Sequence, residues 1–181
     1  MKKVFFIFFF LIFAFKVNCE EIKMLLKLES GEVEIKLFPD VAPNHVKRIL
    51  TLSKNEKYNG VVFHRVIDGF MAQTGDVQFG NSKNLNSSLV GTGGSDLPDL
   101  KAEFSGLPHQ RGTLSMARSA NPNSANSQFF ICFDAAPHLD RQYTIFGQVT
   151  KGMDLVDKIK KGSGPNGSVD NPDKIVSLTE K

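Results

Sequence analysis

The stretch that decides the fold is "FHRVIDGFMAQTGD", residues 63–76. Residues 61–65 and 70–73 are rich in apolar and β-favouring side chains, and Asp68-Gly69 between them is a typical turn pair. The stretch therefore predicts two short strands joined by a tight turn.

This predicted hairpin places one cation beside an apolar surface. His64 and Arg65 come just before Phe70 and Met71, and Gln73 follows two residues later. Taken alone, Arg65 would be read as a solvated strand residue and Phe70 and Met71 as ordinary core. The hairpin by itself therefore leaves its chemistry open.

The flanking sequence predicts a mainly β fold. Apolar residues at strand or helix spacing predict six further strands and two helices. The strands are residues 22–28 and 33–37, which turn at Ser30-Gly31, with 112–116, 128–133, 143–149 and 175–178; the helices are 43–54 and 152–161. Residues 77–99 and 119–127 are predicted loops. Short strands without βαβ alternation indicate a closed or nearly closed antiparallel barrel.

The first 19 residues are typical of a secretory signal peptide. Lys2 and Lys3 precede an apolar run over residues 4–15, and Val17 and Cys19 occupy the small-residue positions before a cleavage site. The run is too short to span a bilayer, which needs about 20 apolar residues. Alternatives are an uncleaved anchor, a buried N-terminal strand, or lipid attachment at Cys19.

Charge and cysteine content exclude several function classes. Removal of three lysines with the signal leaves 22 − 3 = 19 basic residues against 19 acidic ones, so the mature chain carries no basic surplus for nucleic acid. Cys132 would be the only cysteine of residues 20–181, and its apolar neighbours indicate a buried side chain. The four histidines lack metal-ligand spacing, so neither a metal nor a cofactor is predicted.

Four blocks of the chain resemble the cyclophilin-type peptidyl-prolyl cis–trans isomerases. They are residues 63–76, "GTGG" at 91–94, "GTLSMARSANPNSANSQFFICF" at 112–133 and "FGQV" at 146–149. The resemblance spans residues 21–181, and its loop "MARSANPNSANSQFF" is more similar to the bacterial branch. It implies one domain, residues 20–181, built as a closed eight-stranded antiparallel β-barrel capped by two α-helices.

The resemblance also implies a site on the outer face of the barrel. Arg65 matches the catalytic arginine, Gln73 the glutamine beside it, and His64 a further groove residue, for which a packing role stays open. The implied substrate-binding residues are Phe70, Met71, Ala117, Arg118, Gln128, Phe130, His138, Leu139 and Tyr143.

Three of these positions depart from the common eukaryotic pattern of the family. Arg118 stands in place of an asparagine, His138 in place of a tryptophan, and Tyr143 in place of a histidine. Loss of the indole at position 138 implies weak binding of cyclosporin-type macrocycles.

The function implied is acceleration of X–Pro bond rotation in exported proteins as they fold. A proline-peptide-binding chaperone or scaffold of the same fold is the alternative, and a hydrolase using His64 is a third, although no serine or cysteine shows an evident His–Asp relay. The expected partners are proline-containing segments, without nucleic acid, and the expected state is a monomer that meets a membrane only through an uncleaved signal.

The predicted location depends on the host cell. It is the periplasm or the exterior for a bacterium, and the secretory pathway for a eukaryote. In the secretory pathway, Asn86 and Asn166 lie in sequences that accept N-glycans.

Overall fold

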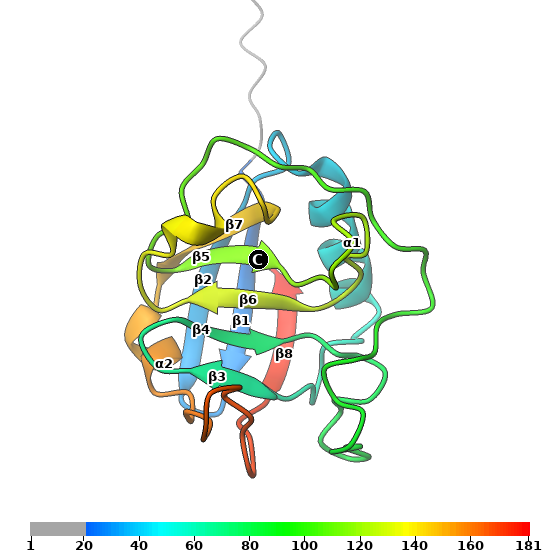
Figure 1. The fold of residues 1–181 in the computed structure, drawn as a ribbon, viewed down its shortest axis with the longest axis vertical. Helices are drawn as coiled ribbons and strands as arrows, with labels where there is room; N and C mark the ends of the chain where they lie inside the picture. The colour runs from blue at the N-terminus through cyan, green and yellow to red at the C-terminus, as the bar shows by residue number, and fades with distance from the viewer. Residues whose placement is uncertain (1–20) are drawn as a thin grey trace, which may run out of the picture.

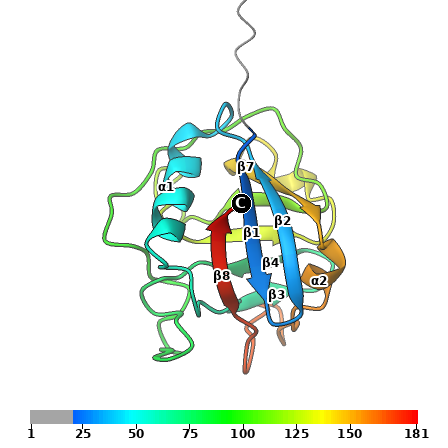
Figure 2. The same cartoon turned by 180° about the vertical axis from the view of Figure 1, so that it is seen from behind.

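Residues 21–181, which the computed structural model describes, form a curled β-sheet with two α-helices (Figures 1 and 2). The predicted signal peptide, residues 1–19, lies outside the described residues. The strands are β1 (Lys23–Leu28), β2 (Gly31–Leu37), β3 (Arg65–Ile67), β4 (Met71–Thr74), β5 (Thr113–Met116), β6 (Phe129–Cys132), β7 (Ile145–Lys151) and β8 (Ile175–Glu180). The helices are α1 (Pro43–Lys54), α2 (Met153–Asp157) and a 3₁₀ turn, η1 (Pro137–Leu139).

All eight strands pair in one antiparallel sheet, in the order β3-β4-β6-β5-β7-β2-β1-β8. In Figure 1, β4, β5 and β6 run across the direction of β1, β2 and β8, so the sheet curls around its core. Between the two end strands, the described chain forms isolated bridges such as Val62–Lys174 and no continuous ladder. Residues 162–168 lie against β3 instead, through the Arg65–Ser168 bridge. The sheet is therefore a curled half-barrel, and the full closure that was predicted is not confirmed.

The β1–β2 hairpin follows directly from its alternating pattern. Leu26 faces Val33 across the pair, and the apolar residues of both strands point into the core while the residues between them are exposed or half-buried. The predicted hairpin and the loop over residues 77–99 are confirmed.

Most strands differ from their predicted bounds by one or two residues at an end, and β3 and α2 differ more. Strand β3 begins only at Arg65, because Val61 and Val62 form isolated bridges instead of a ladder. Helix α2 ends at Asp157, whereas helical spacing predicted residues 152–161. The chain leaves the helix there because the Lys160 N–H donates to the Asp173 carboxylate at 2.7 Å.

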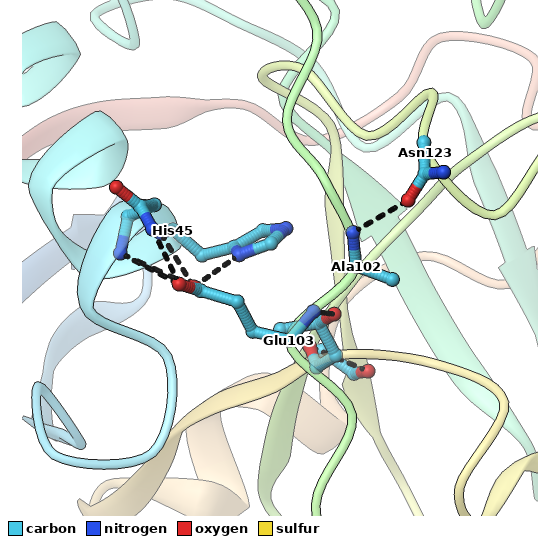
Figure 3. Close-up of polar contacts among 7 residues, drawn as sticks. His45, Ala102, Glu103 and Asn123 are labelled. Carbon is cyan, nitrogen blue, oxygen red and sulfur yellow. Dashed lines mark hydrogen bonds and ion pairs between the residues drawn. The ribbon is translucent and has the colours of Figure 1, made fainter.

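Helix α1 has the predicted bounds, but its first turn is satisfied from far along the chain (Figure 3). Ala42 at the N-cap offers no side-chain acceptor. The Glu103 carboxylate instead accepts the main-chain N–H groups of Asn44 and His45, and it lies 2.6 Å from His45 Nδ1. Next to it, the Ala102 N–H donates to the Asn123 side chain at 3.0 Å. Such a remote acidic cap leaves no local sequence signature.

Two apolar clusters lie on opposite faces of the sheet. The larger fills the interior and includes Phe129, whose ring meets Tyr58 and Phe146 edge to face. The smaller lies on the outer face around Phe130, the next residue of β6, because successive strand residues point to opposite faces. None of the helices in residues 21–181 has the length and apolar character to span a membrane.

Candidate active site

A pocket of about 180 Å³ lies on the outer face of the sheet, beside the smaller cluster. It brings together nine of the twelve predicted site residues: Arg65, Phe70, Met71, Gln73, Ala117, Arg118, Phe130, Leu139 and Tyr143. Their order across the sheet explains this. Arg65 pairs with Gln73, Gln73 with Phe130, and Phe130 with Ser115, which sets a cation, an amide and an aromatic ring in one row.

The Arg65 guanidinium is fixed on two sides. Its Nε–H donates to the main-chain carbonyl of Asn166 at 3.0 Å, and its Nη1 donates to Gln73 Oε1 at 3.2 Å. Among residues 21–181, no acceptor bonds to its Nη2 group, which stays available to a ligand. Partial burial lowers the pKa of Arg65, but an arginine keeps its charge at any physiological pH.

Gln73 is itself held by a second amide. Its Nε2 donates to Gln128 Oε1 at 3.0 Å, and Gln128 Nε2 donates to the carbonyls of Gly91 and Gly93 at 3.0 and 2.8 Å. Gln128 therefore lies behind the pocket wall and supports Gln73.

The apolar side of the pocket is centred on Phe130. Its ring meets Tyr143 edge to face, with ring centroids 5.9 Å apart, and stacks on His109 at 6.3 Å. Tyr143 is covered in turn by Arg118, whose guanidinium carbon lies 4.3 Å above the ring and whose Nη2 donates to the Gln142 carbonyl at 3.0 Å. Arg118 thus builds a wall of the pocket.

His109 was not predicted as a site residue, and it forms a spatial Ser–His–Asp relay. His109 Nδ1 lies 2.9 Å from Asp140 Oδ1, and Nε2 lies 3.0 Å from Ser115 Oγ. Burial lowers the pKa of His109, although Asp140 opposes this shift. Ser115 is fully buried and its hydroxyl also bonds the Thr144 carbonyl, so it cannot reach a substrate as a nucleophile. The relay supports the underside of Phe130.

His64 and His138 do not line this pocket. His64 is only 8% exposed and lies beneath Gly91, and burial lowers the pKa of its imidazole. His138 is exposed and lies beside Phe70, with ring centroids 5.3 Å apart. His138 therefore lies beside Phe70 without lining the pocket.

A second hollow of about 390 Å³ adjoins the pocket and shares Gln73, Ala117 and Arg118 with it. Its remaining lining is polar and belongs to two loops: Gly91, Thr92, Gly93, Ser119, Ser124, Asn126 and Gln128. The sequence predicted these two segments, 77–99 and 119–127, only as loops. No Asp or Glu lines either hollow, and residues 21–181 contain no cluster of three potential metal ligands.

Comparison with known proteins agrees with this geometry. Residues 23–180 match the family model described as cyclophilin type peptidyl-prolyl cis-trans isomerase/CLD. A probable peptidyl-prolyl cis-trans isomerase of Brucella suis is 61% identical over 158 residues, which cover 86% of this chain and 81% of that protein. A peptidyl-prolyl cis-trans isomerase of Helicobacter pylori is 41% identical over 141 residues, covering 76% of this chain and 80% of that protein.

The fold has a counterpart among solved structures. A crystal structure of a Cryptosporidium parvum cyclophilin type peptidyl-prolyl cis-trans isomerase, determined in the presence of the dipeptide Ala-Pro, matches with a TM-score of 0.75 and 26% identity. The match covers 88% of this chain and 98% of that one. The chain therefore belongs to the cyclophilin-type peptidyl-prolyl cis–trans isomerases.

Proposed function

We propose that Arg65 and the apolar pocket together lower the barrier to X–Pro rotation, without a covalent intermediate. Rotation breaks amide resonance against a barrier of about 18–20 kcal/mol. In the twisted state the charge separation of the planar amide is lost, and the proline nitrogen gains a lone pair. An apolar pocket disfavours the polar planar state, and a fixed donor stabilises the twisted one.

The observation that carries this proposal is the position of the Arg65 guanidinium. Two of its donor groups are committed to Asn166 and Gln73, and the third is available at the edge of a pocket walled by Phe130 and Met71. Because the Arg65 guanidinium is already oriented, its donor groups need little reorganisation when the lone pair forms on the proline nitrogen.

The required energy is modest. Turnover at about 10 per second corresponds to a barrier of about 16 kcal/mol, so the enzyme must supply a saving on the order of 4 kcal/mol relative to the uncatalysed barrier. One charge-assisted hydrogen bond is worth about 1.5–3 kcal/mol. Arg65 therefore supplies much of the saving, and removal of water by the pocket supplies the rest.

We infer that the substrates are proline-containing segments of protein chains. The crystal structure of the Cryptosporidium parvum relative was determined in the presence of the dipeptide Ala-Pro, which supports the same substrate class here. Since the pocket shares Gln73, Ala117 and Arg118 with the second hollow, a chain seated with its proline in the pocket has room to continue there.

A protease-coupled isomerisation assay with a proline peptide tests this proposal. Arg65→Ala should reduce catalytic efficiency about ten- to hundredfold while the thermal midpoint stays close to that of the wild type. Gln73→Ala should reduce catalytic efficiency less than Arg65→Ala does, because the Asn166 carbonyl still accepts a hydrogen bond from Arg65. Near-normal turnover in Arg65→Ala would favour catalysis by the apolar pocket alone, or a binding scaffold with incidental turnover.

We further propose that the protein is exported and that its signal peptide is removed after Cys19. The basic start, the apolar run over residues 4–15 and the acidic residues that follow support this. N-terminal sequencing of the exported protein should begin near residue 20. An intact Met1 on a membrane-bound form, or a lipid on Cys19, would contradict the proposal.

A further inference from the structure

Asp76, the last residue of the stretch 63–76, has a fully buried carboxylate. Its Oδ1 accepts the main-chain N–H groups of Gln78 at 3.1 Å and Phe79 at 2.9 Å. Its Oδ2 accepts those of Gly91 at 2.7 Å and Gly93 at 3.0 Å. A buried charge is costly unless hydrogen bonds satisfy it, and four main-chain donors do so here.

The glycine loop fits this carboxylate closely. A Cβ on Gly93 would lie 2.5 Å from Asp76 Oδ1, and Gly91 has a φ of +91°, which other residues rarely adopt. A Cβ on Gly91 would also lie 3.2 Å from the buried His64 ring. Asp76 and the ring of His64 therefore fix the loop from beneath.

The same loop orients both glutamines behind Arg65. Gly91 and Gly93 direct their N–H groups to Asp76 and their carbonyls to Gln128 Nε2. Because the amino group of Gln128 is committed to these carbonyls, its oxygen must face the amino group of Gln73.

The oxygen of Gln73 is then the atom left to face Arg65 Nη1. If either amide were reversed, an amino group would face another donor. The Gly91 and Gly93 carbonyls, which can only accept, thus determine the donor–acceptor direction of the two amides, and Asp76 holds the loop that presents these carbonyls. Hydrogen bonds in such a chain also strengthen one another by polarisation.

We propose that Asp76 is a positioning residue for Arg65, acting through Gly91, Gly93, Gln128 and Gln73. This inference rests on the proposed role of Arg65. Asp76 does not touch the substrate; it keeps an acceptor in front of the guanidinium and so keeps Nη2 aimed at the pocket.

A double-mutant cycle tests the proposal on the purified protein. Asp76→Asn keeps the shape of the side chain but replaces one acceptor oxygen with a donor that faces main-chain N–H groups. It is made alone and together with Arg65→Ala, and catalytic efficiency on one proline peptide is measured with the thermal midpoint. Glu103→Gln is the matched control, since Glu103 is also a carboxylate that accepts main-chain N–H groups but caps α1 instead.

We expect Asp76→Asn to lower catalytic efficiency about tenfold when Arg65 is present and to have almost no effect in Arg65→Ala, as residues of one hydrogen-bond network are not additive. Glu103→Gln should lower the thermal midpoint and leave catalytic efficiency unchanged. If Asp76→Asn does not fold, Asp76→Ser, which keeps one oxygen and admits water, takes its place in the same cycle.

Two results would overturn the inference: an equal loss of efficiency with and without Arg65, or no loss in the presence of Arg65. Both are distinct from failure of the proposed function, which would show as normal turnover in Arg65→Ala itself.

Discussion

Phe129 and Phe130 are neighbours on one strand, yet they belong to two different regions of the molecule. Phe129 packs in the interior among other apolar rings. Phe130 is nearly as buried, but it faces the outer pocket, where Arg65 supplies a fixed charge. Burial of an aromatic ring therefore does not separate the two regions, because both rings are buried. The cation beside the outer cluster is what makes that cluster a candidate site.

A cavity larger than this pocket makes the same point. It has a volume of about 690 Å³ and lies between α1 and the ends of β1 and β8. Its lining is mostly apolar, and its lysines are surface residues without a supporting chain of amides like the one behind Arg65. The smaller cavity is therefore the stronger candidate site, because of these two cavities it alone has a hydrogen-bonded cation beside aromatic walls.

Removal of each ring in turn tests whether Phe129 mainly supports stability and Phe130 mainly supports turnover. Phe129→Ala should destabilise the fold by about 3–5 kcal/mol, since it leaves a cavity in the close-packed interior. Phe130→Ala should cost less stability, because the space opens onto the pocket and admits water, but it should reduce turnover strongly. Denaturant unfolding and the isomerisation assay on both variants measure the two effects. If the two variants lost equal stability and had equal turnover, Phe129 and Phe130 would not have the different roles described above.

Extending the apolar wall of the pocket should strengthen ligand binding. His138→Trp adds something like 60 Å² of apolar contact next to Phe70, worth about 1.5 kcal/mol or tenfold in affinity for a cyclosporin-type macrocycle. Calorimetry measures it, and Val176→Trp, an exposed position on β8, is the control that should leave affinity unchanged. Equal affinities of His138→Trp and the wild type would mean that residue 138 does not meet the macrocycle.

The smallest expected effect is on pH dependence, and it separates the buried histidines from Arg65. Burial lowers the pKa of His45, His64 and His109 from the ordinary 6.5. The unfolded chain therefore binds these protons at a higher pH than the folded chain does. Stability should be fully present above about pH 6.5 and decrease as the pH falls below it, while Arg65 keeps its charge. A thermal midpoint that rises on acidification from about pH 8 to 5.5 would contradict these shifts.

Much of the fold could be predicted because its signals are local. The alternation in β1 and β2, the helical spacing of α1 and the turn at Asp68-Gly69 each depend on a few neighbouring residues. The end of α2 could not be predicted in this way, because it depends on Asp173, 13 residues beyond Lys160.

The residues that line the candidate site could be predicted, but the distant groups that hold them in place could not. Resemblance to a family placed nine residues in the pocket, but it did not reveal what holds them there. The Asn166 carbonyl lies 101 residues from Arg65, and Glu103 lies 59 residues from Asn44. His109 likewise stacks on Phe130 because β5, which follows it, pairs with β6. Such supports depend on which segments the fold brings together, and no local pattern encodes them.

The central claim is that Arg65 acts on the twisted amide more than on the bound peptide. The most direct test measures kcat by NMR exchange and Kd by calorimetry for the same proline peptide, in the wild type and in Arg65→Ala. The account predicts that kcat falls about ten- to hundredfold while Kd rises much less, since an interaction stronger in the transition state lowers kcat. A rise in Kd that explains the whole loss, with kcat unchanged, would contradict it and reduce Arg65 to a substrate anchor.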